Sequence, residues 1–197
     1  MKIAEIFDSI QGEGSWIGRS CTFIRLQGCS LHCSFCDSAS TWKEGTEDMS
    51  IADILGQVHK KYVVITGGEP TEQADAVKEL IQALHASCHT VAIESNGLYE
   101  HYDKLGADWI VVSPKPNACY HVFLNGINEL KYVVTKEFEP SVAITERIRE
   151  MFGGNIWLQP CDYGDGGKSM YQKVLDIVMS DDRYRAGIQL HKVFGVR

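Results

Sequence analysis

Three of the seven cysteines in the sequence, Cys29, Cys33 and Cys36, fall within eight residues in a C-x3-C-x2-C pattern. Three thiolates at this spacing can bind one metal centre, but they leave a four-coordinate site one ligand short. An iron–sulfur cluster held by three cysteines has one iron open to another ligand. A structural zinc would need a fourth protein ligand, such as His32 or Cys161. The spacing alone leaves both readings open, and a redox dithiol of Cys33 and Cys36 is a third.

The chain around this loop alternates between apolar runs and amphipathic stretches. Runs rich in β-branched and aromatic residues indicate strands, and apolar residues at helical spacing indicate helices. We expect strands over 2–7, 21–26, 62–66, 90–94, 109–112, 130–134, 156–158 and 187–190. We expect helices over 51–58, 74–86, 99–105, 140–151 and 168–179, and an irregular loop over 117–128. Continuous apolar strands that alternate with helices predict an α/β fold with a mostly parallel sheet.

Polar or glycine-rich clusters follow nearly every expected strand. They are the cysteine loop and the segments 67–70, 94–96, 113–115 and 159–160. In parallel α/β sheets and barrels, ligands bind at the edge where the carboxyl ends of the strands meet. The pattern therefore predicts one site to which the strands contribute in turn.

Several side chains in these clusters have both a chemical and a structural interpretation. The Glu69 carboxylate can hold an ammonium group, or Gly67–Pro70 can be a plain strand-to-helix turn. Glu94 can accept a hydrogen bond from a ribose hydroxyl, or it can be a buried, paired carboxylate. Asp37 and Ser38 offer the hard oxygen ligands that magnesium prefers, although such a pair is also common in turns and helix caps.

Three cations, Arg25, Lys115 and Lys131, lie at or near expected strand ends. They can bind a carboxylated substrate, or they can be solvated residues at the edge of the sheet. The tail from His191 to Arg197 mixes charged and apolar residues, and a tail of this kind is often frayed.

Composition narrows the class of protein. The 197 residues are 44% hydrophobic, enough for a core, and carry a formal net charge of −7. Without a basic run we expect no nucleic-acid partner, and without a long apolar stretch we expect no membrane span. Because the chain begins with charged residues we expect no signal peptide, and the clustered cysteines then predict a metal site in the reducing cytoplasm. We expect a single domain over 1–197, with an N-terminal extension over about 1–20 and a tail over about 187–197.

Taken together, these residues resemble the radical S-adenosylmethionine (SAM) enzymes. The cysteine loop after one strand and Gly-Gly-Glu-Pro at 67–70 after the next are similar to that superfamily's two recognition motifs. Nearly the whole chain resembles one family within it, the 7-carboxy-7-deazaguanine synthases. The segments that carry this closer resemblance are 9–14, 23–29, 36–38, 64–70, 93–97, 113–115, 158–160 and 191–192.

The resemblance implies a radical SAM core: a partial, pared-down (β/α)6 barrel with a 4Fe-4S cluster, SAM and Mg²⁺. The implied reaction converts 6-carboxy-5,6,7,8-tetrahydropterin to 7-carboxy-7-deazaguanine with loss of ammonia, in queuosine and deazapurine biosynthesis, with SAM acting catalytically. It also implies a flavodoxin or ferredoxin as electron donor, and a homodimer. The alternatives are a glycyl-radical-enzyme activase of the same superfamily and a non-catalytic zinc-binding module.

The resemblance also assigns roles residue by residue. Cys29, Cys33 and Cys36 would hold the cluster, and Ser38, where the family usually has threonine, would bind magnesium. The residues assigned to the substrate are Ile10, Gln11, Gly12, Glu13, Arg25, Thr66 and Arg197. The residues assigned to SAM are Phe35, Cys36, Asp37, Gly68, Glu69, Glu94, Ser113, Pro114, Lys115, Gln159 and Pro160. Relatives can end in a residue whose terminal carboxylate reaches the substrate, and here that residue is Arg197.

Overall fold

The computed structural model describes residues 1–43, 48–115 and 125–197. Its strands form one eight-stranded sheet in which sequence order is also spatial order. The first pair is antiparallel and every later pair is parallel. The strands are β1 (Ile3–Ile10), β2 (Ser20–Leu26), β3 (Tyr62–Gly67), β4 (Thr90–Ser95), β5 (Trp109–Val112), β6 (Glu129–Val134), β7 (Asn155–Pro160) and β8 (Tyr184–Ala186). Because β1 and β8 are the two edges, the sheet is an open, partial barrel, as predicted.

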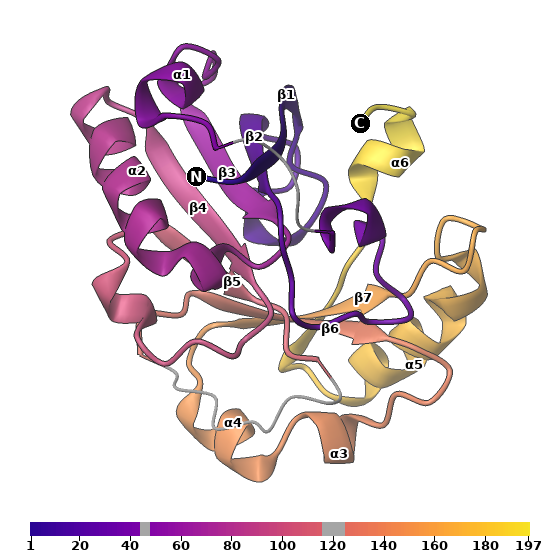
Figure 1. Cartoon of the computed structure of the whole chain (residues 1–197). Helices are drawn as coiled ribbons and strands as arrows, with labels where there is room; N and C mark the ends of the chain where they lie inside the picture. The colour runs from indigo at the N-terminus through magenta and orange to yellow at the C-terminus, as the bar shows by residue number, and fades with distance from the viewer. Residues whose placement is uncertain (44–47, 116–124) are drawn as a thin grey trace.

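Helices cover the outer face of this curved sheet (Figure 1). They are α1 (Ile51–Leu55), α2 (Ala74–Ala86), α3 (Pro140–Ala143), α4 (Glu146–Met151) and α5 (Tyr171–Ser180). A short C-terminal helix, α6 (Leu190–Phe194), lies apart from this layer. The predicted period in α2 is confirmed, since Val77, Leu80, Ile81 and Leu84 are all buried. Among the described residues, no helix has the length and apolar character needed to cross a membrane.

The two faces of the sheet bury different side chains, because successive residues of a strand point to opposite sides. One set, including Ile24, Ile65 and Ile93, joins the helices in the main core. The other set forms a second, smaller core near the amino ends of the strands, where Val64 and Ala92 pack with Trp16. Toward the carboxyl ends of the strands the inner face becomes polar, with Thr66 and Glu94 following Val64 and Ala92. This end of the barrel can therefore bind a polar ligand.

The open side of the barrel is filled by residues 11–16 and by the C-terminal segment. The Ser15 amide donates to Glu129 Oε2 on β6 (3.0 Å), and Asn155 Nδ2 on β7 donates to Ser15 Oγ (3.0 Å). The Leu190 amide at the start of α6 donates to the Gly12 carbonyl oxygen (2.9 Å). Figure 1 shows α6 on the side of the molecule where β1 lies.

The structure differs from the prediction at several elements. The strand expected over 187–190 is wrong, because β8 lies at Tyr184–Ala186 and α6 follows it. The helix expected over 140–151 is divided at the extended residue Ile144, and Thr145 Oγ1 caps the second part by accepting from the Ile148 amide (3.4 Å).

Smaller differences concern lengths. The first strand runs on to Ile10, and α1 ends at Leu55. The helix expected over 99–105 is reduced to one 3-10 turn at Tyr102–Lys104. Of the irregular loop expected over 117–128, residues 117–124 lie outside the described residues.

Candidate active site

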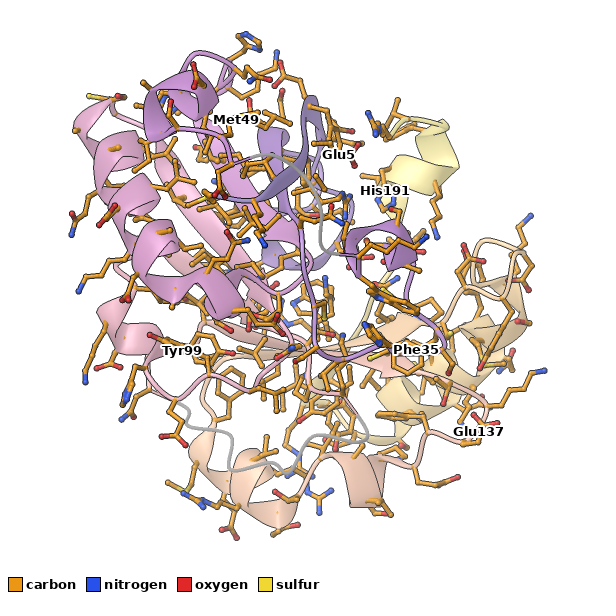
Figure 2. All side chains as sticks on the ribbon, viewed as in Figure 1. Glu5, Phe35, Met49, Tyr99, Glu137 and His191 are labelled. Atoms are coloured by element: carbon orange, nitrogen blue, oxygen red, sulfur yellow. The ribbon has the colours of Figure 1, made fainter. Side chains whose placement is uncertain are left out.

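The polar clusters after the strands line one cavity of about 920 Å³. Every residue assigned from the sequence to substrate, SAM or metal lies on its wall except Pro114, which is buried. Two labelled residues mark its extent in Figure 2: Phe35 in the cysteine loop and His191 on α6, near the strand that carries Glu5. The prediction that these clusters meet is therefore confirmed.

The three cysteines of the loop are half-buried and all line the cavity. Burial raises the pKa of the Cys29 and Cys33 thiols, and the ammonium group of Lys115 opposes this rise at Cys33. Among the described residues, no three histidine, cysteine, aspartate or glutamate side chains converge on a point that could hold a single metal ion. A tetrahedral zinc needs such convergence. Thiolates that each bind a different iron of a cluster do not, so the donor set fits a cluster better.

The loop after β3 is joined to the cysteine loop by backbone hydrogen bonds. The Gly68 amide donates to the Leu26 carbonyl oxygen (2.8 Å), and the Glu69 amide donates to the Gly28 carbonyl oxygen (2.7 Å). Gly28 immediately precedes the first cysteine. A Cβ atom on Gly68 would lie 1.8 Å from the Gly28 oxygen, so only glycine allows the two loops to approach this closely.

Replacing Gly68 by alanine is expected to separate these loops and to lower the free energy of unfolding by about 1–3 kcal/mol, the usual cost of overpacking. Chemical denaturation measures this change. Gly153→Ala is the matched control, because a Cβ atom there meets nothing within 4 Å. Equal stability of the two variants would contradict the close approach.

Glu69 is buried and bonded within the protein, which changes the interpretation of its carboxylate. Its Oε1 accepts from the amide (3.1 Å) and hydroxyl (2.7 Å) of Thr71 and from the Ser95 hydroxyl (2.7 Å). Within the part of the chain that the structure describes, its Oε2 accepts from the Asn96 amide alone (2.7 Å). Burial raises the pKa of Glu69, and these hydrogen bonds oppose the rise. Counting the described contacts, Oε2 keeps room for a ligand ammonium and Oε1 does not, and the side chain mainly ties the ends of β3 and β4 together.

A chain of charged groups crosses the inner face of the barrel. Lys131 Nζ lies 2.5 Å from Glu13 Oε2 and 3.4 Å from Glu94 Oε2, and the lysine side chain is only 8% exposed. Gln11 Nε2 donates to Glu94 Oε1 (2.9 Å). Burial alone would lower the pKa of Lys131, but Glu13 and Glu94 outweigh it and raise the pKa. Lys131 therefore stays charged and holds two carboxylates in place.

Arg25 connects this face to the cysteine loop. Its Nε donates to Glu5 Oε1 on β1 (2.8 Å), and its Nη1 donates to Ser38 Oγ (2.8 Å). The Ser38 hydroxyl donates in turn to Asp37 Oδ1 (3.1 Å). A guanidinium group held by one carboxylate and directed at the Asp37–Ser38 pair is well placed to meet a substrate carboxylate.

The strands β5 and β7 supply groups on the opposite side of the cavity. Lys115 Nζ donates to Ser113 Oγ (2.7 Å), and burial, followed by the charge of Lys131, lowers the pKa of Lys115. Gln159 is 4% exposed, and neither its Oε1 nor its Nε2 has a hydrogen-bond partner among the described residues. A buried amide without hydrogen-bond partners is energetically costly. The Gln159 side chain therefore fits a site in which a polar ligand supplies the missing partners.

The sequence did not identify one residue of the site, Gln189, and it did not predict the contacts of another, Arg197. Gln189, on the segment wrongly expected to be a strand, reaches Glu13 and Asp37. Arg197 bonds Glu5 through its guanidinium group, which lies 4.6 Å from the Phe7 ring centroid, and its backbone oxygen accepts from the Ser9 hydroxyl. The polar Gln-x-His-Lys run at 189–192 was a signal for the first.

Comparisons with known proteins identify the family of this chain. The family model described as "Radical SAM superfamily" matches residues 23–155. The chain is 32% identical over 207 residues to a 7-carboxy-7-deazaguanine synthase of Synechocystis, covering 99% of this chain and 93% of that protein. It is 35% identical over 208 residues to the synthase of Methanospirillum hungatei, covering 100% and 86%.

A solved structure is also similar. The crystal structure of QueE from Escherichia coli superimposes with a TM-score of 0.70 at 25% identity, covering 96% of this chain and 93% of that one. The described fold and the cysteine loop are those of a radical SAM enzyme, for which the superfamily implies a 4Fe-4S cluster and SAM. This chain belongs to the radical SAM superfamily and, within it, to the 7-carboxy-7-deazaguanine synthases.

Proposed function

We propose that this chain is a carbon–nitrogen lyase that converts 6-carboxy-5,6,7,8-tetrahydropterin to 7-carboxy-7-deazaguanine, with ammonia as the second product. The observation that carries the proposal is that one cavity joins the three cysteines to the charged inner face of the barrel. The printed names of the relatives give the product. The substrate follows from the family resemblance, and the loss of ammonia balances its composition against that of the product.

The cofactors would occupy the cysteine-loop side of the cavity. Cys29, Cys33 and Cys36 would hold the 4Fe-4S cluster, and the backbone of Gly68 and the amide of Gln159 would contact SAM. When bound, the cluster and SAM supply one-electron radical chemistry at the substrate. The residues of the chain bind and orient the reactants and exclude water.

The substrate would occupy the inner face of the barrel. Arg25 would bind its carboxylate, since a guanidinium group can do so through two hydrogen bonds. The Glu13 carboxylate would accept from the N–H groups of the pterin. We propose the same role for Glu94, which the resemblance assigned to SAM, because Lys131 holds it together with Glu13 on this face. Gln11 and Thr66, which each donate to Glu94, would orient it.

We propose that Ser38 binds a magnesium ion that also contacts the substrate carboxylate, with Asp37 beside it. Ser38→Ala is expected to lower the affinity for magnesium by about 10-fold or more, because one oxygen ligand is lost. Titration of turnover with MgCl₂ measures the shift, and Ser40→Ala, at an exposed position nearby, is the control. Loss of the cluster's absorption spectrum in Ser38→Ala would instead give Ser38 a structural role.

The family resemblance supports the remaining proposals about partners and location. We propose a flavodoxin or ferredoxin as the reductant, a cytoplasmic location that keeps the thiolates reduced, and a homodimer. We also propose that residues 1–197 act as one domain, since all eight strands belong to one sheet.

Anaerobic incubation of the reconstituted protein with SAM, a reductant, MgCl₂ and the tetrahydropterin tests the proposed reaction. Mass spectrometry is expected to show 7-carboxy-7-deazaguanine, together with ammonia. A brown, cluster-containing protein that leaves the pterin unchanged would favour the activase. A colourless protein with one tightly bound zinc would favour the zinc module.

A further inference from the structure

Gln189 occupies the point where the two sides of the cavity meet. Its Nε2 donates to Glu13 Oε1 at 2.8 Å and makes a second, longer contact of 3.4 Å with Asp37 Oδ2. Glu13 belongs to the substrate side and Asp37 directly follows the third cysteine. Gln189 is 9% exposed, so a neutral amide group, largely shielded from water, stands between two carboxylates.

The backbone around Gln189 is fixed on both sides. The Gly187 amide donates to the Leu158 carbonyl oxygen on β7 (2.9 Å), and the Leu190 amide donates to the Gly12 carbonyl oxygen (2.9 Å). On α6, Lys192 Nζ lies 2.5 Å from Asp162 Oδ2 in the loop after β7. The side chain is therefore presented from a position that three separate parts of the barrel define.

Loss of the Gln189 amide donor would leave the two carboxylates in an unfavourable arrangement. Without it, the Glu13 Oε1 atom that does not bond Lys131 would lose a short hydrogen bond in a nearly buried site, where Glu13 is 13% exposed. Hydrogen bonds to charged groups are stronger than neutral ones, and a buried acceptor left without a donor is costly. Glu13 and Asp37 would also face each other with no donor between them.

We propose that Gln189 is a positioning residue: its amide sets the substrate-binding carboxylate Glu13 at a fixed distance from the Asp37–Ser38 step of the cysteine loop. This inference rests on the proposed function, because it concerns how the pterin is placed relative to the cofactor. Gln189 acts through Glu13 and Asp37 and leaves the cysteine ligands untouched. Its loss should impair pterin binding while cluster assembly and SAM binding persist.

Two variants separate positioning from space filling. Gln189→Met keeps the length of the side chain but removes the donor, and we expect KM for the pterin to rise about 10-fold. Gln189→Glu adds a third carboxylate beside Glu13 and Asp37, and we expect a larger rise, because like charges repel. Gln172→Met is the matched control, since Gln172 Nε2 donates to Asp176 Oδ1 (2.7 Å) on the exposed face of α5.

Three measurements on the reconstituted protein decide the question. The pterin KM is expected to be lowest in the wild type, higher in Gln189→Met and highest in Gln189→Glu, with a much smaller change in kcat. Electron paramagnetic resonance of the reduced cluster is expected to show the normal response to SAM in all variants, but a response to pterin shifted to higher concentration in the Gln189 variants. The thermal midpoint of Gln189→Met should stay within a few degrees of wild type.

Three results would overturn the inference that Gln189 positions Glu13. If Gln189→Met matches wild type in pterin KM and in the pterin-dependent spectrum, Gln189 only fills space and the inference is wrong. A change in the SAM response, or equal effects of Met and Glu, would also overturn it. If the wild-type protein itself makes no deazaguanine, the proposed function fails instead, and the two failures are thereby distinguished.

Discussion

Replacing Cys33 by alanine is expected to abolish product formation while the chain remains folded. The turn around it is held by backbone hydrogen bonds, from the Cys33 amide to the Leu31 oxygen and from the Cys36 amide to the Cys33 oxygen (3.0 Å each). These bonds do not require the thiol. Without one of three thiolates the cluster should not assemble, so we expect turnover to fall by at least ~10³-fold, about 4 kcal/mol in transition-state stabilisation. Iron content and initial rate after anaerobic reconstitution measure the effect.

Cys88→Ala is the control for this experiment. Cys88 is exposed and follows α2, away from the residues that line the cavity. It is expected to keep about four irons per chain and full activity. A Cys33→Ala protein that retained both would show that the three-cysteine loop does not hold the cluster.

Replacing Lys131 by methionine is expected to give the largest loss of stability. Methionine fills most of the space, but it leaves Glu13 and Glu94 facing each other without their cation. Removing one partner of a buried ion pair typically costs 3–5 kcal/mol, so we expect the free energy of unfolding to fall by about 3–5 kcal/mol. Denaturation in urea measures this change, and pterin binding should be lost in the same protein.

A double variant tests the cause of that loss. Glu13→Gln combined with Lys131→Met removes one of the unpaired charges, and it should recover part of the lost stability. Lys78→Met, at an exposed position on α2, should change stability by less than about 0.5 kcal/mol. If the double variant were no more stable than Lys131→Met, the ion pair would not be the source of the effect.

The sequence predicted the barrel well where the pattern is local. The helical period in α2 buries one face of the helix, and the continuous apolar run of β3 is buried on both faces of the sheet, so composition and spacing alone reveal them. The turn residues after each strand then place the cysteine loop, Gly68 and Gln159 at one end of the sheet. Parallel strands bring their carboxyl ends together whatever the details of the packing.

The remainder depends on contacts between distant residues. Gln189 meets partners 152 and 176 positions away, which no local pattern encodes. The strand expected at 187–190 was a second reason why Gln189 was missed. The apolar residues there suggested strand pairing, but the hydrogen bonds to β7 end at Gly187. The commitment of Glu69 to Thr71, Ser95 and Asn96 likewise appears only when β3 and β4 are neighbours. Hydrogen bonds and ion pairs between strands on different parts of the barrel therefore could not be predicted from local sequence patterns.

The number of product molecules formed per molecule of SAM consumed tests the central claim most directly. With SAM limiting and the tetrahydropterin in excess, under anaerobic conditions with reductant and MgCl₂, this account predicts many molecules of 7-carboxy-7-deazaguanine for each molecule of SAM lost. Absence of the deazaguanine, or consumption of SAM with the pterin recovered unchanged, would contradict it.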